Sequence, residues 1–108
     1  MARYMFEADY SAEGTKGLIK DGGTKRRAAV EAGLKSVGGK MEAMYFTFGI
    51  RDAVIIAELP DNVSAAALSL TVSASGAVAL KTTPLLTCAD VDAAAKKSVA
   101  YRAPGAAK

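Results

Sequence analysis

The side chains best suited to chemistry gather in one short segment, from Tyr45 to Asp52. Tyr45 and Thr47 alternate along a run typical of a strand, and Arg51 and Asp52 follow a Gly49-Ile50 turn. A phenol, a hydroxyl, a guanidinium and a carboxylate at this spacing could bind a polar small molecule. A buried carboxylate with a raised pKa could act as a general base, so Tyr45 and Asp52 are the candidate catalytic acid and base. The alternative is structural: Tyr45 is a core aromatic, and Asp52 hydrogen-bonds the turn or pairs with Arg51.

Three more polar residues could line the same cavity, namely Tyr4, Tyr10 and Glu58. Glu58 interrupts an apolar run, and a buried acid there would need a partner. Its other interpretation is a strand-end residue that reaches water. The ligand-binding candidates are therefore Tyr4, Tyr10, Tyr45, Thr47, Arg51, Asp52 and Glu58.

A second candidate site lies in the segment from Lys20 to Arg27, which combines a glycine pair, a helix start and clustered cations. Backbone N–H groups together with Arg26 or Arg27 could hold a phosphate or carboxylate. The spacing is not that of a P-loop. These cations could equally form a solvated helix face or an oligomer contact.

The chain contains no histidine, which excludes histidine triads, histidine metal sites and a histidine general base. We predict no metal site and no cofactor. Cys88 is the single cysteine, so there is no internal disulfide, and a quiet structural thiol in a reducing compartment is expected.

Composition describes an ordinary soluble domain. The chain has 108 residues, 51% of them hydrophobic and 23% charged. The net charge of +3 is too small to indicate nucleic acid or a membrane surface by itself. Neither a signal peptide nor a membrane helix is evident, so we expect a cytoplasmic protein of a bacterium-like cell.

Hydrophobic periodicity predicts the elements that must position these side chains. The expected N-caps are Ser11, Thr24 and Asp61, and Thr87-x-x-Asp90 resembles a capping box for the final helix. Glycine pairs, Pro60 and Gly76 mark the ends of elements. In the helix after Asp61, Val63, Ala67, Leu70 and Ala74 repeat at helical spacing. We predict strands at 3–10, 41–48, 52–59 and 77–83, helical segments at 11–21, 24–37 and 61–75, and a final helix at about 88–97.

This order, β-α-β-β-α-β with a short C-terminal helix, predicts an α+β ferredoxin-like fold with a four-stranded antiparallel sheet. Residues 1–97 would form the domain and 98–108 a flexible tail. The strand at 41–48 would place Met41, Ala43, Tyr45 and Thr47 on one face.

Both helices of this fold cover the same face of the sheet. Either Val54 and Ile56 or the alternate set of the same strand must then face away from them. An exposed apolar sheet face usually indicates an interface. We therefore expect two chains to pack sheet against sheet as a dimeric α+β barrel. RNA-recognition modules share this topology and stack bases on aromatic residues of the sheet. The strand at 52–59 has no aromatic residue, so we expect no nucleic-acid partner.

Several spaced motifs occur along the chain, namely Ser11-x-Glu13-Gly14, Asp21-Gly22-Gly23-x-Lys25-Arg26-Arg27, Gly38-Gly39-Lys40, Tyr45-Phe46-Thr47-Phe48-Gly49-x-x-Asp52, Glu58-x-Pro60-Asp61, Ser75-Gly76 and Pro84-Leu85-Leu86. Together they resemble the GYD-domain family, a group of small bacterial proteins. The resemblance spans about Tyr4 to Val91 and implies a dimeric α+β barrel of uncharacterised function. Arg51 stands where the family's glycine-tyrosine-aspartate signature leads us to expect an aromatic residue.

Two functions remain open from the sequence. The first is a homo-oligomeric module, either a dimeric barrel that binds a small ligand or a structural assembly unit. The alternative is a cofactor-independent enzyme that acts on a small organic substrate in the barrel lumen. In that case Tyr45 and Asp52 would be acid and base, and Arg51 or Arg26 would hold an anionic group.

Overall fold

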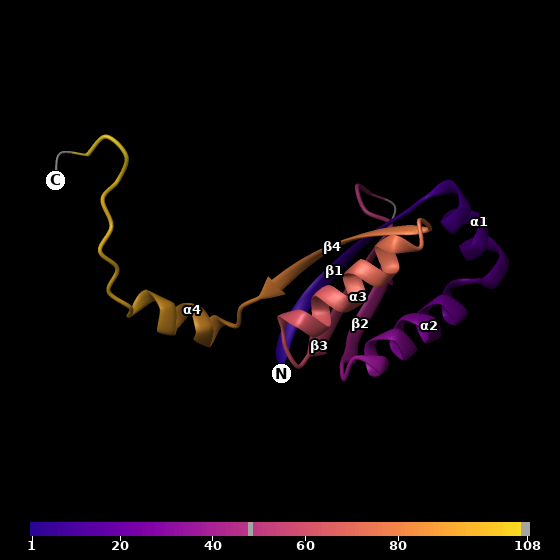
Figure 1. The fold of residues 1–108 in the computed structure, drawn as a ribbon, viewed down its shortest axis with the longest axis horizontal. Coiled ribbons are helices and arrows are strands. Elements are labelled where there is room, and N and C mark those ends of the chain that lie inside the picture. Colours follow the sequence, from indigo (N-terminus) through magenta and orange to yellow (C-terminus); the bar gives the residue numbers. More distant parts are fainter. Residues whose placement is uncertain (48, 107–108) are drawn as a thin grey trace.

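Four strands form one antiparallel sheet in the order β2-β3-β1-β4 (Figure 1). The computed structural model describes residues 1–47 and 49–106. Phe48, the predicted end of the second strand, lies outside them. The chain forms β1 (Ala2–Tyr10), α1 (Ala12–Asp21), α2 (Gly23–Ser36), β2 (Lys40–Phe46), β3 (Ala53–Leu59), α3 (Asn62–Ala74), β4 (Val78–Leu85) and α4 (Cys88–Ala95). This is the predicted α+β, ferredoxin-like arrangement.

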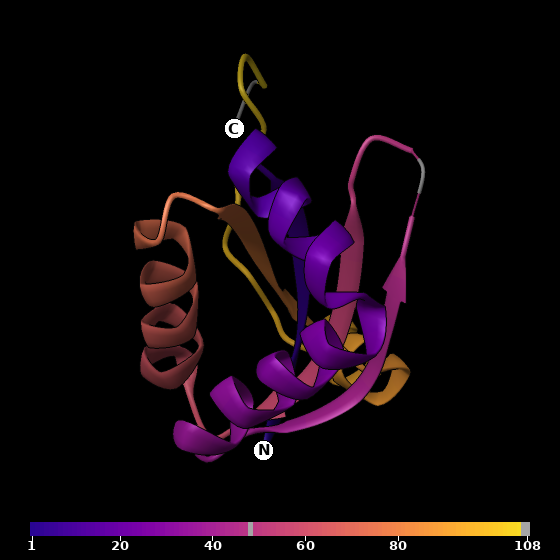
Figure 2. The same cartoon turned by 90° about the vertical axis from the view of Figure 1, so that its right-hand side faces the viewer.

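Alternation along the central strands separates the two faces of the sheet. In β1, Tyr4, Phe6 and Ala8 are buried, while the residues between them are partly exposed. Strand β3 alternates in the same way along its whole length. The buried side chains pack with Leu34 of α2 and Ala65 of α3, so these helices cover the same face. Figure 2 views the molecule from the side of α1 and α2.

Side-chain caps begin three of the helices as predicted. Ser11 Oγ accepts from the Gly14 N–H, and Asp61 Oδ1 accepts from the Ser64 N–H. Thr87 and Asp90 form a complete capping box at α4. The predicted Thr24 cap is wrong: α2 begins at Gly23, because Gly22 takes a positive φ of 82° and turns the chain between α1 and α2.

Two glycines permit contacts that any side chain would block. A Cβ on Gly14 would lie 2.0 Å from the Ala77 carbonyl oxygen, which also accepts from the Ser11 N–H. A Cβ on Gly39 would lie 2.9 Å from the Glu58 carbonyl oxygen. The first contact holds α1 against the start of β4, and the second holds the α2–β2 turn against β3.

The prediction of which β2 side chains share a face of the sheet is wrong, because a β-bulge lies between Met41 and Ala43. The inserted residue moves Met41 to the helix-covered side, where it packs against the core, while Tyr45 stays on the other side opposite Val54. Glu42 also faces the uncovered side, where it pairs with Arg3. Met41 and Tyr45 therefore do not share a face.

The predicted apolar stripe of α3 is wrong as well. Ala65 is the buried residue of this helix, and Leu68 and Val72 lie partly buried beside the core. Val63 is 78% exposed and Leu70 72% exposed. Because apolar residues occur all around α3, periodicity alone could not select the face that meets the sheet.

The C-terminal segment projects from the sheet. The described chain extends 60 Å along its longest axis, and its radius of gyration of 17.5 Å exceeds the about 13 Å expected for a domain of this length. Figures 1 and 2 place α4 beyond the end of β4, on the far side of the sheet from α1 and α2. Every residue from Leu86 to Gly105 is exposed. We call residues 86–106 the C-terminal arm.

Candidate functional site

The uncovered face of the sheet has an apolar centre. Strand register places Met5 beside Ile56, Ile56 beside Ala43, and Val54 beside Tyr45. All but Tyr45 are partly buried, and Tyr45 is 72% exposed. We call the uncovered side of the four strands the open face. Of the two sets left open by the sequence, Val54 and Ile56 are the ones that point away from the helices.

Ion pairs flank this apolar centre along the strands. Towards one end, Arg3 Nε lies 3.0 Å from Glu42 Oε2, and Arg3 Nη2 lies 3.7 Å from Glu58 Oε1. Towards the other, Arg51 Nη1 lies 2.7 Å from Asp9 Oδ2, and Arg51 Nε lies 3.6 Å from Glu7 Oε2. The open face thus combines apolar side chains in the middle with paired charges at both ends. An apolar core inside a polar rim is the usual composition of a protein interface.

Of the hairpin residues, Thr47 and Asp52 line a cavity of about 400 Å³ together with Tyr10, whereas Tyr45 and Arg51 do not line it. Tyr45 points to the open face, but the Thr47 hydroxyl donates to the Arg51 carbonyl oxygen. Asp52 Oδ2 accepts from the Tyr10 N–H at 2.8 Å, and the Asp52 N–H donates to the Ala8 carbonyl oxygen at 3.0 Å. Asp52 therefore extends the pairing of β1 with β3. Its carboxylate is engaged by the backbone of β1, whereas the structural interpretation expected a bond to the turn or a pair with Arg51, and Tyr45 is exposed where that interpretation expected a core aromatic.

The remaining cavity candidates lie on opposite faces of the sheet. Tyr4 is 2% exposed on the covered face, and its hydroxyl donates to Asn62 Oδ1 at 2.5 Å. Tyr10 also lies on the covered face, where its hydroxyl accepts from Arg26 Nε at 3.3 Å. Glu58 lies on the open face with Arg3. The expectation that Tyr4, Tyr10 and Glu58 line one cavity is corrected, since alternation puts the tyrosines and the acid on opposite sides.

The side chains of Arg26 and Arg27 also point in different directions. Arg27 Nε lies 3.4 Å from Glu31 Oε1 on the outer side of α2. Arg26 instead turns towards the sheet and stacks over the Tyr10 ring, with its guanidinium carbon 5.8 Å from the ring centroid. The anion site considered from the sequence, with backbone N–H groups and Arg26 or Arg27, therefore has its two candidate cations on different sides of α2. The charge pattern alone gave no signal that Arg26 would turn inward.

Sequence reasoning did not select Met5, Glu7 and Asp9, although these residues belong to the open face. The alternation of a strand at 3–10 places them on the face opposite Tyr4, so the sequence did contain a signal for them. Met5, Glu7 and Asp9 did not stand out, because the tyrosines of the same strand are the more reactive residue type.

Neither a metal centre nor a spanning helix occurs in the part of the chain that the structure describes. Residues 1–47 and 49–106 contain no group of three or more metal-binding side chains. No helix among them is both long and apolar enough to cross a membrane. Cys88 is exposed at the start of α4. The Ser64 backbone N–H, helped by the Ser64 side chain, lowers the pKa of the Asp61 carboxyl below its ordinary value.

Comparison with known protein families matches residues 4–95 to the GYD domain. The chain belongs to the GYD-domain family. No curated protein and no solved structure gives a significant match. The match begins in β1 and runs through α4, so the helix that projects from the body is part of the family's domain.

The structure explains several GYD motifs by turns and caps. Ser11 caps α1 and Gly14 admits Ala77. Gly38 has a positive φ of 77° and ends α2. Asp61 caps α3, and Gly76 ends it with a φ of 75°. At these positions the motif residues form helix caps, turns and close backbone contacts.

Proposed function

We propose that this GYD-domain protein is a homo-oligomeric assembly module, in which the open face packs against the open face of a second copy. The arrangement of that face carries the proposal, with Met5, Val54 and Ile56 between two clusters of ion pairs. In one chain these apolar side chains stay partly exposed. A second sheet would bury them and leave the charges near the rim, giving a dimeric α+β barrel.

The open face alone is small for a stable interface, which favours a contribution from the C-terminal arm to the proposed contact between two copies. Four strands about 4.8 Å apart, each rising about 3.3 Å per residue, give a footprint of roughly 500 Å². Specific interfaces bury about 800 Å² on each partner. The arm projects on the same side as the open face and exposes Leu86, Val91 and Tyr101. An isolated helix as short as α4 is marginal in water, so a partner surface would also stabilise it.

Ligand binding in the space between the sheets is a further part of this proposal. Tyr45 and Glu58 both belong to the open face, and Arg51 reaches across it to Glu7 and Asp9. These groups would border the lumen of a barrel. The enzyme alternative has less support, because the Asp52 carboxylate accepts a backbone hydrogen bond from Tyr10 and completes the sheet.

Sedimentation velocity of the wild type and two lysine variants tests the assembly. We expect the wild type to sediment at twice 11.1 kDa at micromolar concentration. Ile56→Lys places a charge in the apolar centre and should give a folded monomer. Leu70→Lys makes the same kind of change on the outer surface of α3 and should leave the dimer intact.

Two results would contradict the proposal. One is a wild type that stays at 11.1 kDa across the accessible concentrations. The other is a dimer that survives Ile56→Lys and dissociates with Leu70→Lys, which would place the interface on α3. Circular dichroism of each variant establishes that it remains folded.

A further inference from the structure

A cavity of about 400 Å³ lies on the helix-covered side of the sheet, where β1 and β2 end and β3 begins. Helix α1 and the first residue of α2 form its other side. Sites for small molecules are typically of this size, with mostly apolar walls and a few polar groups. The lining residues are Tyr10, Thr15, Leu18, Gly23, Phe46, Thr47 and Asp52.

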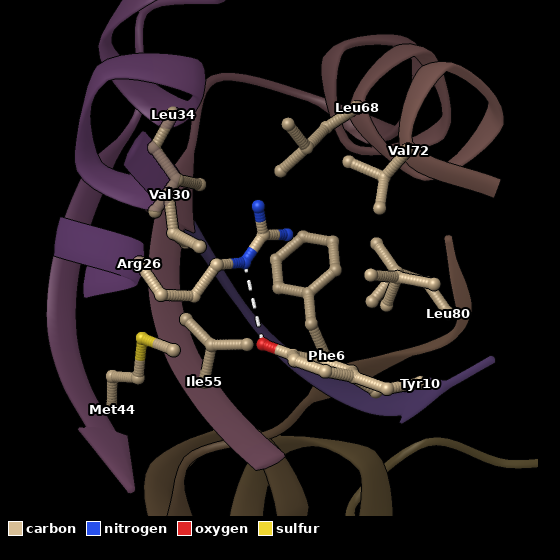
Figure 3. Close-up of a pocket in the computed structure, with 12 residues that line it drawn as sticks. Phe6, Tyr10, Arg26, Val30, Leu34, Met44, Ile55, Leu68, Val72 and Leu80 are labelled. Atoms are coloured by element: carbon tan, nitrogen blue, oxygen red, sulfur yellow. Dashed lines mark hydrogen bonds between the residues drawn. The ribbon is translucent and has the colours of Figure 1, made fainter. Parts of the chain in front are cut away.

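Two other cavities of the chain are less suited to a ligand. The space beside Arg26, shown in Figure 3, is about 30 Å³ and holds about two water molecules. The groove of about 450 Å³ between α3 and β4 is large enough. Its polar side chains, however, bond to one another, since Tyr4 donates to Asn62 and Thr82 donates to Ser69. Polar groups that are already paired gain little from a ligand.

The Phe46 ring forms a fixed apolar wall of the 400 Å³ cavity. A Cβ on Gly23 would lie 3.2 Å from Phe46 Cε2, so the ring packs directly against the backbone of α2. Phe46 nevertheless remains 41% exposed. The Tyr10 hydroxyl is directed to Arg26 and accepts from its Nε (Figure 3). Because a fixed ring offers a flat apolar surface for offset or edge-on stacking, this wall favours an aromatic ligand.

The polar groups of this cavity present hydrogen-bond acceptors. The Thr47 hydroxyl donates its hydrogen to the Arg51 carbonyl oxygen, so only its lone pairs are left for a ligand. The Asp52 carboxylate accepts from the Tyr10 N–H through Oδ2, and a carboxylate has room for several further donors. Its negative charge also disfavours an anion in the same space. A matching ligand therefore carries donors and no negative charge.

We propose that this cavity binds a small uncharged aromatic molecule with a hydroxyl or N–H donor. The ring lies between Phe46 and Leu18, and the donor bonds to Asp52. All of the lining residues belong to one chain and to the helix-covered side. The site is therefore independent of the assembly proposed for the open face.

An NMR titration of the wild-type protein with para-cresol tests this site. We expect saturable shifts of the Phe46 ring and of the Leu18 methyl groups. Because para-methylanisole has the same ring but no donor, it should bind at least about fivefold more weakly. The anion para-toluate brings a second carboxylate to Asp52 and should cause no saturable shifts.

Two pairs of variants provide matched controls. Asp52→Asn keeps an oxygen that can accept from the Tyr10 N–H but loses the charge, so para-cresol should bind about fivefold more weakly. Asp21→Asn removes the same charge from the exposed end of α1 and should leave the affinity unchanged. Leu18→Ala should weaken binding by at least about fourfold, the equivalent of one lost methylene contact. Ile19→Ala changes a side chain of the same helix that is 79% exposed and should have no effect.

The proposal is overturned if the wild type shows no saturable shifts with para-cresol. It is equally overturned if para-methylanisole binds as tightly as para-cresol, which would mean that no donor is recognised. An Asp21→Asn protein that loses as much affinity as Asp52→Asn would show that Asp52 has no specific contact. Circular dichroism establishes that each variant remains folded.

Discussion

The two faces of the sheet are built from alternate residues of the same strands, yet only one of them is covered by the chain itself. On the covered face, Phe6, Ile55 and Leu59 are buried under α2 and α3. On the open face, Met5 and Ile56 remain partly exposed between ion pairs. One strand sequence can therefore encode a buried core on one side and a partly exposed apolar surface on the other.

The C-terminal arm, like the open face, is not covered by other parts of the described chain. Its helix has a full capping box but buries no residue. Its local capping signals form a helix, while Leu86 and Val91 remain exposed. Four predictions follow, from the largest expected effect to the smallest; the first three compare the two faces, and the fourth concerns the cap of α3.

Leu34→Ala should have the largest effect, because Leu34 is 0% exposed in the core under α2. We expect a loss of about 2–5 kcal/mol in the free energy of unfolding, from lost burial and the remaining cavity. Urea denaturation followed by circular dichroism measures it. The loss should occur in the Ile56→Lys monomer background too, since this core is complete within one chain. A loss that appeared only in the dimer would contradict the distinction between the faces.

Ile56→Ala should reduce stability by about 2 kcal/mol, and mainly when the protein is associated. Ile56 is only partly buried by its own chain, and the second copy would supply the rest of its contacts. Because a dimer gains apparent stability with protein concentration, the denaturation midpoint of the wild type should rise on concentration. The midpoint of Ile56→Ala should rise less. Equal, concentration-independent midpoints would argue that the open face faces water.

Tyr4→Phe and Tyr45→Phe compare one hydroxyl on each face. Removing the Tyr4 hydroxyl loses its hydrogen bond to Asn62 and should cost about 1 kcal/mol. Tyr45 is exposed, so its phenylalanine variant should change the free energy of unfolding of the monomer by less than about 0.5 kcal/mol. Both values come from urea melts in the Ile56→Lys background. A larger effect at Tyr45 would mean that its hydroxyl has an intrachain role.

Asp61 should make a small contribution that depends on pH. The Ser64 N–H stabilises the ionised carboxylate and lowers its pKa in the folded chain from the ordinary 3.8. This contribution is present in full above that ordinary value and is lost as the pH falls through the lower, folded-state pKa. Asn caps helices well but does not titrate in this range, so Asp61→Asn is the control. Stability curves of the two proteins that stay parallel below pH 4 would contradict this role.

Much of the fold could be predicted because its signals are local. The Ser11, Asp61 and Thr87 caps depend on side chains within one helical turn, and the alternation of β1 depends only on the period of a strand. The bulge at Met41 could not be predicted in this way. A single inserted residue reverses the facing of its neighbours without changing composition.

The candidate site was harder to predict, because it depends on how elements pack. Val63 and Leu70 fit a helical stripe as well as Leu68 and Val72 do, and only the sheet selects between them. Arg26 sits in a charged segment typical of a solvated face, yet the gap between α2 and α3 draws it inward. Tyr4 and Tyr10 were chosen as site candidates because tyrosine can take part in chemistry. Their positions in β1 place them on the helix-covered face of the sheet instead.

The most direct measurement is an isotope-filtered NOE experiment on a sample that mixes labelled and unlabelled chains. It detects only contacts between two copies of the protein. We predict intermolecular NOEs to the methyl groups of Met5, Val54 and Ile56, and none to those of Val63 and Leu70 on α3. Intermolecular NOEs confined to α3, or methyl groups on the open face that contact no second chain and are accessible to a paramagnetic cosolute, would contradict the account.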